Sequence, residues 1–566
     1  MPLILMANNA ILNVSNLSVG FQSRHGLTEV LHGISFELNR GKTTCIVGES
    51  GSGKSVSARA ILNMVTHPGI ITGGKILFDP DGKGTKDLTL FDPRGKAIRE
   101  IRGGRIGMIF QEPMSSLSPV HTIGSQIVEA IKLHRDVDKK TAESMAIQAL
   151  AQVEIPNPDR AVERYSFEFS GGMRQRAMIA MALACQPDVL IADEPTTALD
   201  VTTQAEILDL ISTLQSDLGM AVMFITHDMG VVAEIADDVV VMEKGNIVES
   251  GDINDIFDAP KHSYTQKLLA SVQRLSEPAA GKVKPVANAT EILRVKNLHL
   301  WFEKKEGFFQ RTTEITKAVN GVDFVLRQGE ALGIVGESGS GKTSVGRCVA
   351  RVHNPKSGII EYSGKDITKA SEEELRSKRR QIRMIFQDPF ASLNPRMTVK
   401  QIIAEPLVVN KIASGKELDE RIAKLLLEVG LDPNMMERYP HAFSGGQRQR
   451  IVIARAIALE PKLVIADEPT SALDVSIRTQ VLDLLLRLQA DLGLSFIFIS
   501  HDMAVIRYFC DRVAVMYQGQ LVEIGETEEV IGNPQHPYTK ALLSSVPISN
   551  PKLRGTRQRH RYEPTA

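Results

Sequence analysis

A glycine-rich octapeptide occurs twice in this 566-residue chain, and its residue types are those that bind phosphate groups. The two P-loops, residues 48–55 and 336–343, fit the pattern G-x-x-x-x-G-K-[ST], and each follows an apolar run. The glycines let backbone N–H groups close around phosphates, the lysine reaches the β- and γ-phosphates, and the last hydroxyl suits Mg²⁺. The residues expected to act in this way are Gly48, Ser50, Gly51, Gly53, Lys54 and Ser55, then Gly336, Ser338, Gly339, Gly341, Lys342 and Thr343.

Each P-loop is followed later in the chain by an apolar strand of four residues that ends in a carboxylate pair. The pairs are Asp193-Glu194 and Asp467-Glu468. We expect the aspartate to reach the metal, directly or through a water, and the glutamate to lie beside the γ-phosphate and polarise a water. A lone Asp-Glu-Pro would more often simply end a strand, but a position downstream of a P-loop favours the catalytic interpretation.

A third element, Ser-Gly-Gly, occurs at residues 170–172 and again at 444–446. Each occurrence is followed by a segment whose apolar residues have helical spacing. A serine at the start of a helix, followed by two glycines, offers unpaired N–H groups and the positive end of the helix dipole to an anion. Taken alone, this element would indicate only a helix cap. Together with the P-loop, it predicts two phosphate-binding surfaces in each half of the chain.

The elements that position these residues repeat in tandem. The P-loops lie 288 residues apart, and the later motifs settle at a separation of 274 residues. We predict a first domain at 8–275, a linker at 276–290, a second domain at 291–548 and a basic tail at 549–566. Short β-type runs alternate with helical patterns, which predicts an α/β fold with a mainly parallel central sheet.

The composition excludes disordered, collagen-like and coiled-coil proteins. With 43% hydrophobic and 23% charged residues, the chain resembles an average globular protein. Its net charge of −1 provides no global field that would attract nucleic acid, and no apolar run reaches the roughly 18 to 20 residues of a membrane-spanning helix. The four cysteines lie far apart, which favours reduced, buried thiols over a metal site. We therefore expect a chain that does not cross a membrane by itself.

The ordered motifs carry a family resemblance. Ser-Gly-Gly-Gln ahead of the Asp-Glu strand, with a glutamine after an apolar strand and a histidine downstream, resembles the signature set of ATP-binding cassette (ABC) ATPases, over nearly the full length. The resemblance implies two tandem P-loop NTPase domains, each with a RecA-like core, an antiparallel β subdomain and a helical subdomain. It also implies that the two copies face each other head to tail and enclose two ATP molecules with Mg²⁺.

By this resemblance, each site combines residues of both copies. One site would contain Lys54, Gln111, Asp193, Glu194 and His227 together with Ser444, Gly446 and Gln447. The other would contain Lys342, Gln387, Asp467, Glu468 and His501 together with Ser170, Gly172 and Met173. The glutamates and histidines would be catalytic, and the two glutamines would join the hydroxyls and aspartates as metal ligands.

Further positions follow from the same resemblance. Phe21 and Phe302 stand where the family places an aromatic ring against adenine, although core packing rivals that role for both. Asp200 and Asp474 match the loop that couples the two sites. Met173 departs from the glutamine of the second copy and removes amide hydrogen bonds from one site. Because both glutamates and both histidines are present, we expect two hydrolytic sites with modest asymmetry.

Within this family, two pairs of segments resemble the oligopeptide, dipeptide, nickel and glutathione importer branch. One pair is Phe-Ser-Gly-Gly-Met-Arg-Gln-Arg at residues 169–176 and Phe-Ser-Gly-Gly-Gln-Arg-Gln-Arg at 443–450, and the other is 259–265 and 533–539. This implies an ATPase subunit that drives uptake of a small solute, most simply a peptide or glutathione-like compound. Two separate integral-membrane permease chains would dock on the segments around Pro119 and Pro395, and an extracytoplasmic solute-binding protein would be an indirect partner. The chain would lie at the cytoplasmic face of the bacterial inner membrane.

Other tandem ATPases are alternatives. A ribosome-associated translation factor would need a long, charged arm between the copies, but residues 276–290 contain only Lys282 and Lys284 as basic residues. A DNA-repair ATPase would need a coiled-coil or zinc-bearing insertion between Lys54 and Asp193, which the sequence does not show. We therefore expect no nucleic-acid partner, and the sequence leaves the transported solute open.

Overall fold

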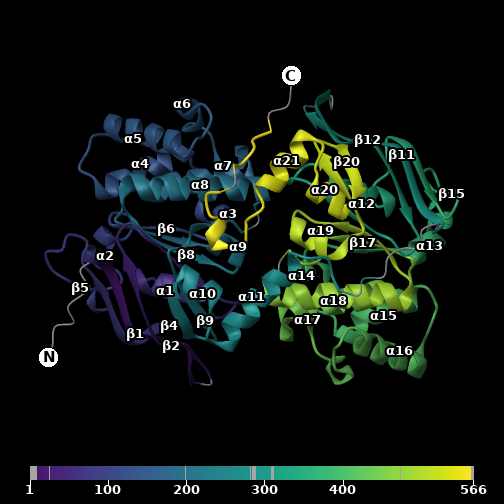
Figure 1. The fold of residues 1–566 in the computed structure, drawn as a ribbon, viewed down its shortest axis with the longest axis horizontal. Helices are drawn as coiled ribbons and strands as arrows, with labels where there is room; N and C mark the ends of the chain where they lie inside the picture. The colour runs from purple at the N-terminus through teal and green to yellow at the C-terminus, as the bar shows by residue number, and fades with distance from the viewer. Residues whose placement is uncertain are drawn as a thin grey trace. The chain divides into compact units, whose positions relative to one another are not determined.

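The structure is a computed structural model. It describes residues 9–24, 26–197, 199–280, 282, 289–306, 311–471, 473–556 and 558–562. Seven residues of the predicted linker, 281 and 283–288, and five of the predicted tail, 557 and 563–566, lie outside these ranges. The chain divides into two units (Figure 1). Unit 1 consists of Met1–Leu199, Thr203–Val272 and Pro547–Arg557, and unit 2 of Asp200–Thr202, Gln273–Val546 and Gln558–Ala566.

Unit 1 is built on a six-stranded sheet with the order β10-β9-β3-β8-β7-β6. All neighbouring strands are parallel except the edge pair β10 and β9. Every residue of the inner strands β3, β7 and β8 is buried, as expected of continuous apolar runs in a parallel sheet. The strands are β3 (Thr43–Val47), β6 (Ile106–Ile109), β7 (Val189–Asp193), β8 (Ala221–Thr226), β9 (Asp238–Glu243) and β10 (Asn246–Asp252).

An antiparallel sheet and a group of helices flank this central sheet. Figure 1 shows them at opposite ends of unit 1, with the six-stranded sheet between them. The antiparallel sheet has the order β2-β1-β4-β5, formed by β1 (Ala10–Ser23), β2 (Gly26–Asn39), β4 (Gly69–Phe78) and β5 (Lys86–Asp87). The helical group contains α4 (Ile123–His134), α5 (Lys139–Gln152), α6 (Pro158–Ala161) and α7 (Gly171–Leu183).

The remaining helices of the first copy connect these layers. They are α1 (Lys54–Ile61), α2 (Lys96–Ile101), α3 (Pro113–Ser116), α8 (Val201–Leu218), α9 (Met229–Ile235), α10 (Ile253–Asp258) and α11 (Ser263–Leu275). Because β3 and β7 are parallel to the same strand, β8, their carboxyl ends meet at one edge of the sheet. Ligands bind at such edges in open α/β sheets, and here the P-loop and the Asp-Glu pair are brought together.

Unit 2 repeats this plan. Its six-stranded sheet has the order β16-β17-β18-β13-β19-β20 and its antiparallel sheet the order β12-β11-β14-β15. The strands are β11 (Glu291–Glu306), β12 (Arg311–Arg327), β13 (Ala331–Val335), β14 (Ser357–Tyr362), β15 (Lys365–Asp366), β16 (Ile382–Ile385), β17 (Leu463–Asp467), β18 (Ser495–Ile499), β19 (Arg512–Tyr517) and β20 (Gln520–Glu526). The helices are α12 (Lys342–Val349), α13 (Glu372–Gln381), α14 (Pro389–Ser392), α15 (Val399–Val409), α16 (Gly415–Glu428), α17 (Gly445–Ile457), α18 (Val475–Leu492), α19 (Met503–Phe509), α20 (Thr527–Gly532) and α21 (Pro537–Ser544).

The predicted α/β fold with a mainly parallel central sheet is confirmed in both units. The four cysteines are buried free thiols, also as predicted. In the part of the chain that the structure describes, no helix combines the length and the apolar character needed to cross a bilayer.

Candidate active site

The P-loop of each copy has a shape that requires glycine. A Cβ atom on Gly48 would lie 2.2 Å from the carbonyl oxygen of Met242, and one on Gly336 would lie 2.1 Å from that of Met516. Both distances are well inside van der Waals contact, so a side chain at either position would force the loop away from the neighbouring strand. The loop therefore keeps its backbone close to the sheet and leads directly into α1 or α12.

The P-loop lysines are buried inside their own loops. Lys54 Nζ donates hydrogen bonds to the carbonyl oxygens of Gly48 (2.7 Å) and Glu49 (3.0 Å). Lys342 Nζ does the same with Gly336 and Glu337, both at 2.7 Å. Burial lowers the pKa of Lys342 although neighbouring carboxylates oppose the shift. Each ammonium group is thus held by neutral carbonyls, which a phosphate anion can replace with a stronger, charge-assisted contact.

A hydroxyl and a carboxylate lie together beside each lysine. Ser55 Oγ donates to Asp193 Oδ1 at 2.8 Å, and Thr343 Oγ1 donates to Asp467 Oδ1 at the same distance. Burial raises the pKa of both aspartates, against the effect of these hydrogen bonds. Mg²⁺ prefers hard oxygen ligands and keeps several waters or phosphate oxygens, so this adjacent pair of oxygen donors fits it. A bound cation would also relieve the cost of a buried carboxylate.

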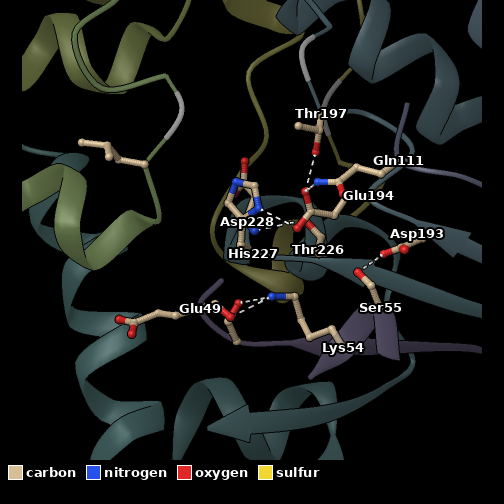
Figure 2. A network of polar contacts seen from close by, with 12 residues as sticks. Glu49, Lys54, Ser55, Gln111, Asp193, Glu194, Thr197, Thr226, His227 and Asp228 are labelled. Carbon is tan, nitrogen blue, oxygen red and sulfur yellow. Dashed lines mark hydrogen bonds and ion pairs between the residues drawn. The ribbon is translucent and has the colours of Figure 1, made fainter. Parts of the chain in front are cut away.

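The carboxylate of Glu194 is held by three side chains (Figure 2). Gln111 Nε2 donates to Glu194 Oε2 at 2.9 Å, Thr197 Oγ1 donates to the same oxygen at 3.0 Å, and His227 Nδ1 lies 3.2 Å from Oε1. Burial alone would raise the pKa of Glu194, but the contacts with His227 and Thr197 and the charge of Lys54 lower it to about 2. The group is therefore an ionised acceptor at neutral pH, suited to orient a water beside a phosphate.

The second copy repeats this arrangement with one difference. Gln387 Nε2 donates to Glu468 Oε2 at 2.9 Å, and His501 Nδ1 lies 3.2 Å from Oε1. Burial opposes the shift, yet the contact with His501 lowers the pKa of Glu468, and in return the pKa of His501 is raised. Ser471, the counterpart of Thr197, donates instead to the backbone oxygen of Glu468 at 3.1 Å. The carboxylate of Glu468 thus lacks the hydroxyl contact that Thr197 provides in the first copy.

The backbone at both glutamates is strained. Glu194 and Glu468 each have φ of +47°, a left-handed conformation that costs a residue with a side chain about 1 to 3 kcal/mol. In both copies the backbone N–H of the glutamate donates to the end of the adjacent strand, to Ile225 O at 3.0 Å and to Ile499 O at 2.9 Å. Such strain persists where the surrounding structure fixes a residue, as at catalytic sites.

The Ser-Gly-Gly elements cap long helices, and the two copies differ at this point. Ser170 Oγ accepts from Met173 N–H at 3.2 Å at the start of α7, and Ser444 Oγ accepts from Gln447 N–H at 3.4 Å at the start of α17. Gln447 Oε1 also accepts from Ser444 N–H at 3.1 Å, which completes a capping box. Met173 has no group for this second bond and packs against the apolar core.

The second glycine of each element is fixed by helix packing. A Cβ atom on Gly172 would lie 2.8 Å from Thr203 Cγ2 of α8, and one on Gly446 would lie 2.4 Å from Ile477 Cγ2 of α18. The first turn of α7 and of α17 is therefore pressed against the next helix of the domain.

The two candidate adenine-stacking residues are in unlike environments. Phe21 is partly buried and packs against the core beneath the antiparallel sheet. Phe302 is 44% exposed, and its ring contacts His353 edge-on with a centroid distance of 5.7 Å. Exposure suits Phe302 to a stacking role, while core packing accounts for Phe21. The adenine contact stays a prediction for both.

Asp200 contacts a P-loop within unit 2. Its Oδ1 accepts a hydrogen bond from Ser338 N–H at 2.5 Å, and the nearby Thr202 Oγ1 donates to Glu337 Oε1 at 2.8 Å. Asp474 precedes α18 at the N-cap position but accepts no side-chain cap hydrogen bond there. Asp200 is thus coupled directly to one nucleotide-binding loop.

Comparison with known proteins identifies the family. The ABC transporter family matches residues 31–197 and 319–471. The chain belongs to the ABC transporter family. A second family, described as the oligopeptide/dipeptide transporter C-terminal region, matches the segments that follow each ATPase core, residues 248–297 and 522–566.

Two full-length relatives of this ABC protein carry the same description, glutathione import ATP-binding protein GsiA. The relative from Pectobacterium atrosepticum is 47% identical over 580 residues, covering 98% of this chain and 93% of its own. The relative from Escherichia coli K12 is 48% identical over 563 residues, covering 96% and 90%. A solved ABC cassette, a dimeric post-hydrolysis state of MJ0796 with ADP and phosphate, aligns with 42% of this chain and 98% of its own at 28% identity and a TM-score of 0.38. A score this low adds nothing to the assignment.

These matches confirm the predicted family, the tandem ABC fold and an importer ATPase subunit. They give no support to the ribosome-associated alternative. The roles predicted for single residues stay predictions. Thr197 was missed by the sequence analysis, although a hydroxyl follows Asp-Glu-Pro-Thr in both copies and could have pointed to it.

Proposed function

We propose that this ABC ATPase drives the import of glutathione or a closely similar small peptide. One observation carries the proposal: 47–48% identity extends over almost the whole chain to two proteins described as glutathione import ATP-binding proteins. The match of both C-terminal regions to the oligopeptide/dipeptide transporter family supports a peptide-like solute. The relatives' names describe those proteins, and the solute of this chain is our inference.

We infer that each ATP, with Mg²⁺, binds between the P-loop of one copy and the Ser-Gly-Gly helix of the other. Each copy supplies both kinds of anion-binding element, and the hydroxyl–carboxylate pairs Ser55–Asp193 and Thr343–Asp467 offer oxygen ligands for the metal. Asp200 belongs to the first sequence repeat, and its hydrogen bond with Ser338 supports a link between that repeat and the second P-loop. ATP would then favour a closed state because it contacts both copies only in that state.

Two integral-membrane permease chains would use this closure, and the ATPase would lie at the cytoplasmic face of the inner membrane. An extracytoplasmic protein would deliver the solute to the permeases. Exposed apolar side chains support a docking role for the segments that follow Gln111 and Gln387: Val120 is 73% exposed and Phe390 is 59% exposed.

Uptake of labelled glutathione by cells that lack this gene tests the function. We expect uptake to fall to background and to return with the wild-type chain, but not with the E194Q/E468Q double variant. Uptake of labelled leucine, which is no peptide, serves as the control and should not change. Normal glutathione uptake without the gene would refute the proposed solute. Co-purification with ribosomal RNA instead of two hydrophobic chains would refute the transporter assignment.

A further inference from the structure

The segments that follow each ATPase core reach into the P-loops. Tyr264, near the start of α11, accepts a hydrogen bond through its hydroxyl oxygen from the backbone N–H of Glu49 at 2.9 Å. Tyr538, near the start of α21, accepts in the same way from the backbone N–H of Glu337 at 3.1 Å. Both tyrosines are buried, with 8% and 1% of their surface exposed. The same contact therefore occurs independently in each copy.

In the first copy, a chain of hydrogen bonds fixes the tyrosine. Both carboxylate oxygens of Glu249 in β10 accept backbone N–H groups, from Lys261 at 2.7 Å and from His262 at 3.0 Å. His262 Nδ1 then accepts the backbone N–H of Tyr264 at 3.2 Å. Glutamate, histidine and tyrosine thus form a relay of contacts from the sheet to the P-loop.

The second copy repeats every step of this relay. Glu523 in β20 accepts the backbone N–H groups of Gln535 at 2.8 Å and of His536 at 3.0 Å. His536 Nδ1 accepts the backbone N–H of Tyr538 at 3.1 Å and caps α21. The histidines therefore act as helix caps, and the tyrosine is the member of each relay that touches the nucleotide-binding loop.

The point of attachment matters because the P-loop lysine holds the same short stretch of backbone. Lys54 Nζ binds the carbonyl oxygens of Gly48 and Glu49. When this ammonium turns to the phosphates of ATP, those carbonyls lose their partner. The bond from Glu49 N–H to Tyr264 involves no group that ATP recruits, so it can persist in both states. A buried N–H without a partner is costly, which gives the loop a reason to keep this contact.

We propose that Tyr264 and Tyr538 are positioning residues that hold the first turn of each P-loop in its phosphate-binding shape. The inference rests on the ATPase activity and holds whatever solute is transported. In the second copy the ring of Tyr538 is also held by aromatic packing. Tyr562 packs against Tyr538 and Tyr517 with ring-centroid distances of 5.6 and 5.1 Å. Glu243 stands at the position of Tyr517 in the first copy, so this aromatic packing is specific to the second.

Substitution by phenylalanine removes only the oxygen that accepts the loop N–H. We expect the Y264F/Y538F double variant to raise the KM for ATP about three- to tenfold, with kcat within about twofold of wild type, since a net hydrogen bond corresponds to a factor of this size. Y517F is the matched control, because that hydroxyl accepts only from the exposed Gln518 in the described contacts. Its KM should equal the wild-type value.

Hydrogen exchange of the nucleotide-free chain gives a local readout that needs no turnover. In the single variant Y264F, exchange within residues 43–54 should accelerate while residues 331–342 remain unchanged, and in Y538F the reverse should hold. Each variant thus carries its own control, and either one decides the outcome if the other fails to fold. An unchanged KM would overturn the proposal, as would a fall in kcat at constant KM or unchanged exchange in the cognate P-loop.

Discussion

Replacing the two glutamates one at a time tests whether both sites hydrolyse ATP. Glu194→Gln and Glu468→Gln each keep the size of the side chain and remove its charge. Both carboxylates are nearly buried and have the same glutamine and histidine partners, and only the Thr197 hydroxyl contact distinguishes them. This near-identity predicts that neither site dominates turnover.

The size of the effect follows from what such a group contributes. A positioned acid or base accelerates a reaction by roughly 10²- to 10⁴-fold, so the altered site should keep at most about 1% of its rate. If the two sites hydrolyse ATP independently, each single variant should retain about half of the wild-type turnover. If hydrolysis at one site depends on the other, each variant should retain less than half, and the two variants should still lose comparable fractions of the turnover.

Steady-state ATP turnover of the purified chain measures this directly. Binding of a fluorescent ATP analogue should stay within about threefold of wild type in both variants, because the P-loops are intact. Glu143→Gln makes the same chemical change on the surface of α5, where the glutamate pairs with Lys139, and should leave turnover unchanged. Full activity in one glutamate variant and complete loss in the other would show that only one site hydrolyses ATP, which contradicts this prediction.

Three further predictions concern the loop, the ion pair and the helix cap. Lys54→Ala should reduce the number of ATP molecules bound per chain from about two to about one, because alanine has neither the charge nor the length to contact the phosphates. Calorimetry measures this number, and an unchanged stoichiometry would contradict the prediction. Since the pKa of His501 is raised above its usual 6.5, its pairing with Glu468 stabilises the fold fully below pH 6.5 and loses that effect as pH rises through the raised pKa. His501→Gln should therefore shift the urea midpoint most at low pH, and a pH-independent shift would count against the ion pair. Met173→Gln should complete the capping box that Gln447 forms in the second copy and stabilise the first by about 0.5 to 1 kcal/mol, measured as a higher urea midpoint; a lower midpoint would show that the methionine packing matters more.

Local pattern was sufficient to predict the groups that bind phosphate and metal. The P-loop encodes its own geometry through glycines such as Gly48, and Asp193 follows a strand whose apolar run is unmistakable. Gln111 is a different case, because it meets Glu194 only when β6 and β7 pair in register. Residues alone do not reveal such a pairing, and the family resemblance was needed to include this glutamine in the site.

Two contacts were not predicted, one because it depends on tertiary packing and the other because its residues were assigned a different role. Tyr264 lies more than two hundred residues from Glu49 and reaches it only after β10 and α11 have packed on the sheet. The capping box of Gln447 is local, and the Ser-x-x-Gln spacing at residues 444–447 could have pointed to it, but the amide was assigned to the nucleotide site and not to the start of its own helix. Phe21 was predicted to contact adenine, but the structure shows it packed against the core. The sequence could not separate these roles, because an aromatic residue suits both.

The structure of the E194Q/E468Q chain with ATP and Mg²⁺ would test the shared nucleotide sites most directly. We predict that the γ-phosphate held by Lys54 lies about 3 Å from Ser444 Oγ and the Gly446 N–H, and that the γ-phosphate held by Lys342 lies equally close to Ser170 and Gly172. ATP bound entirely by residues of one copy, with the other copy's Ser-Gly-Gly helix turned away, would contradict it.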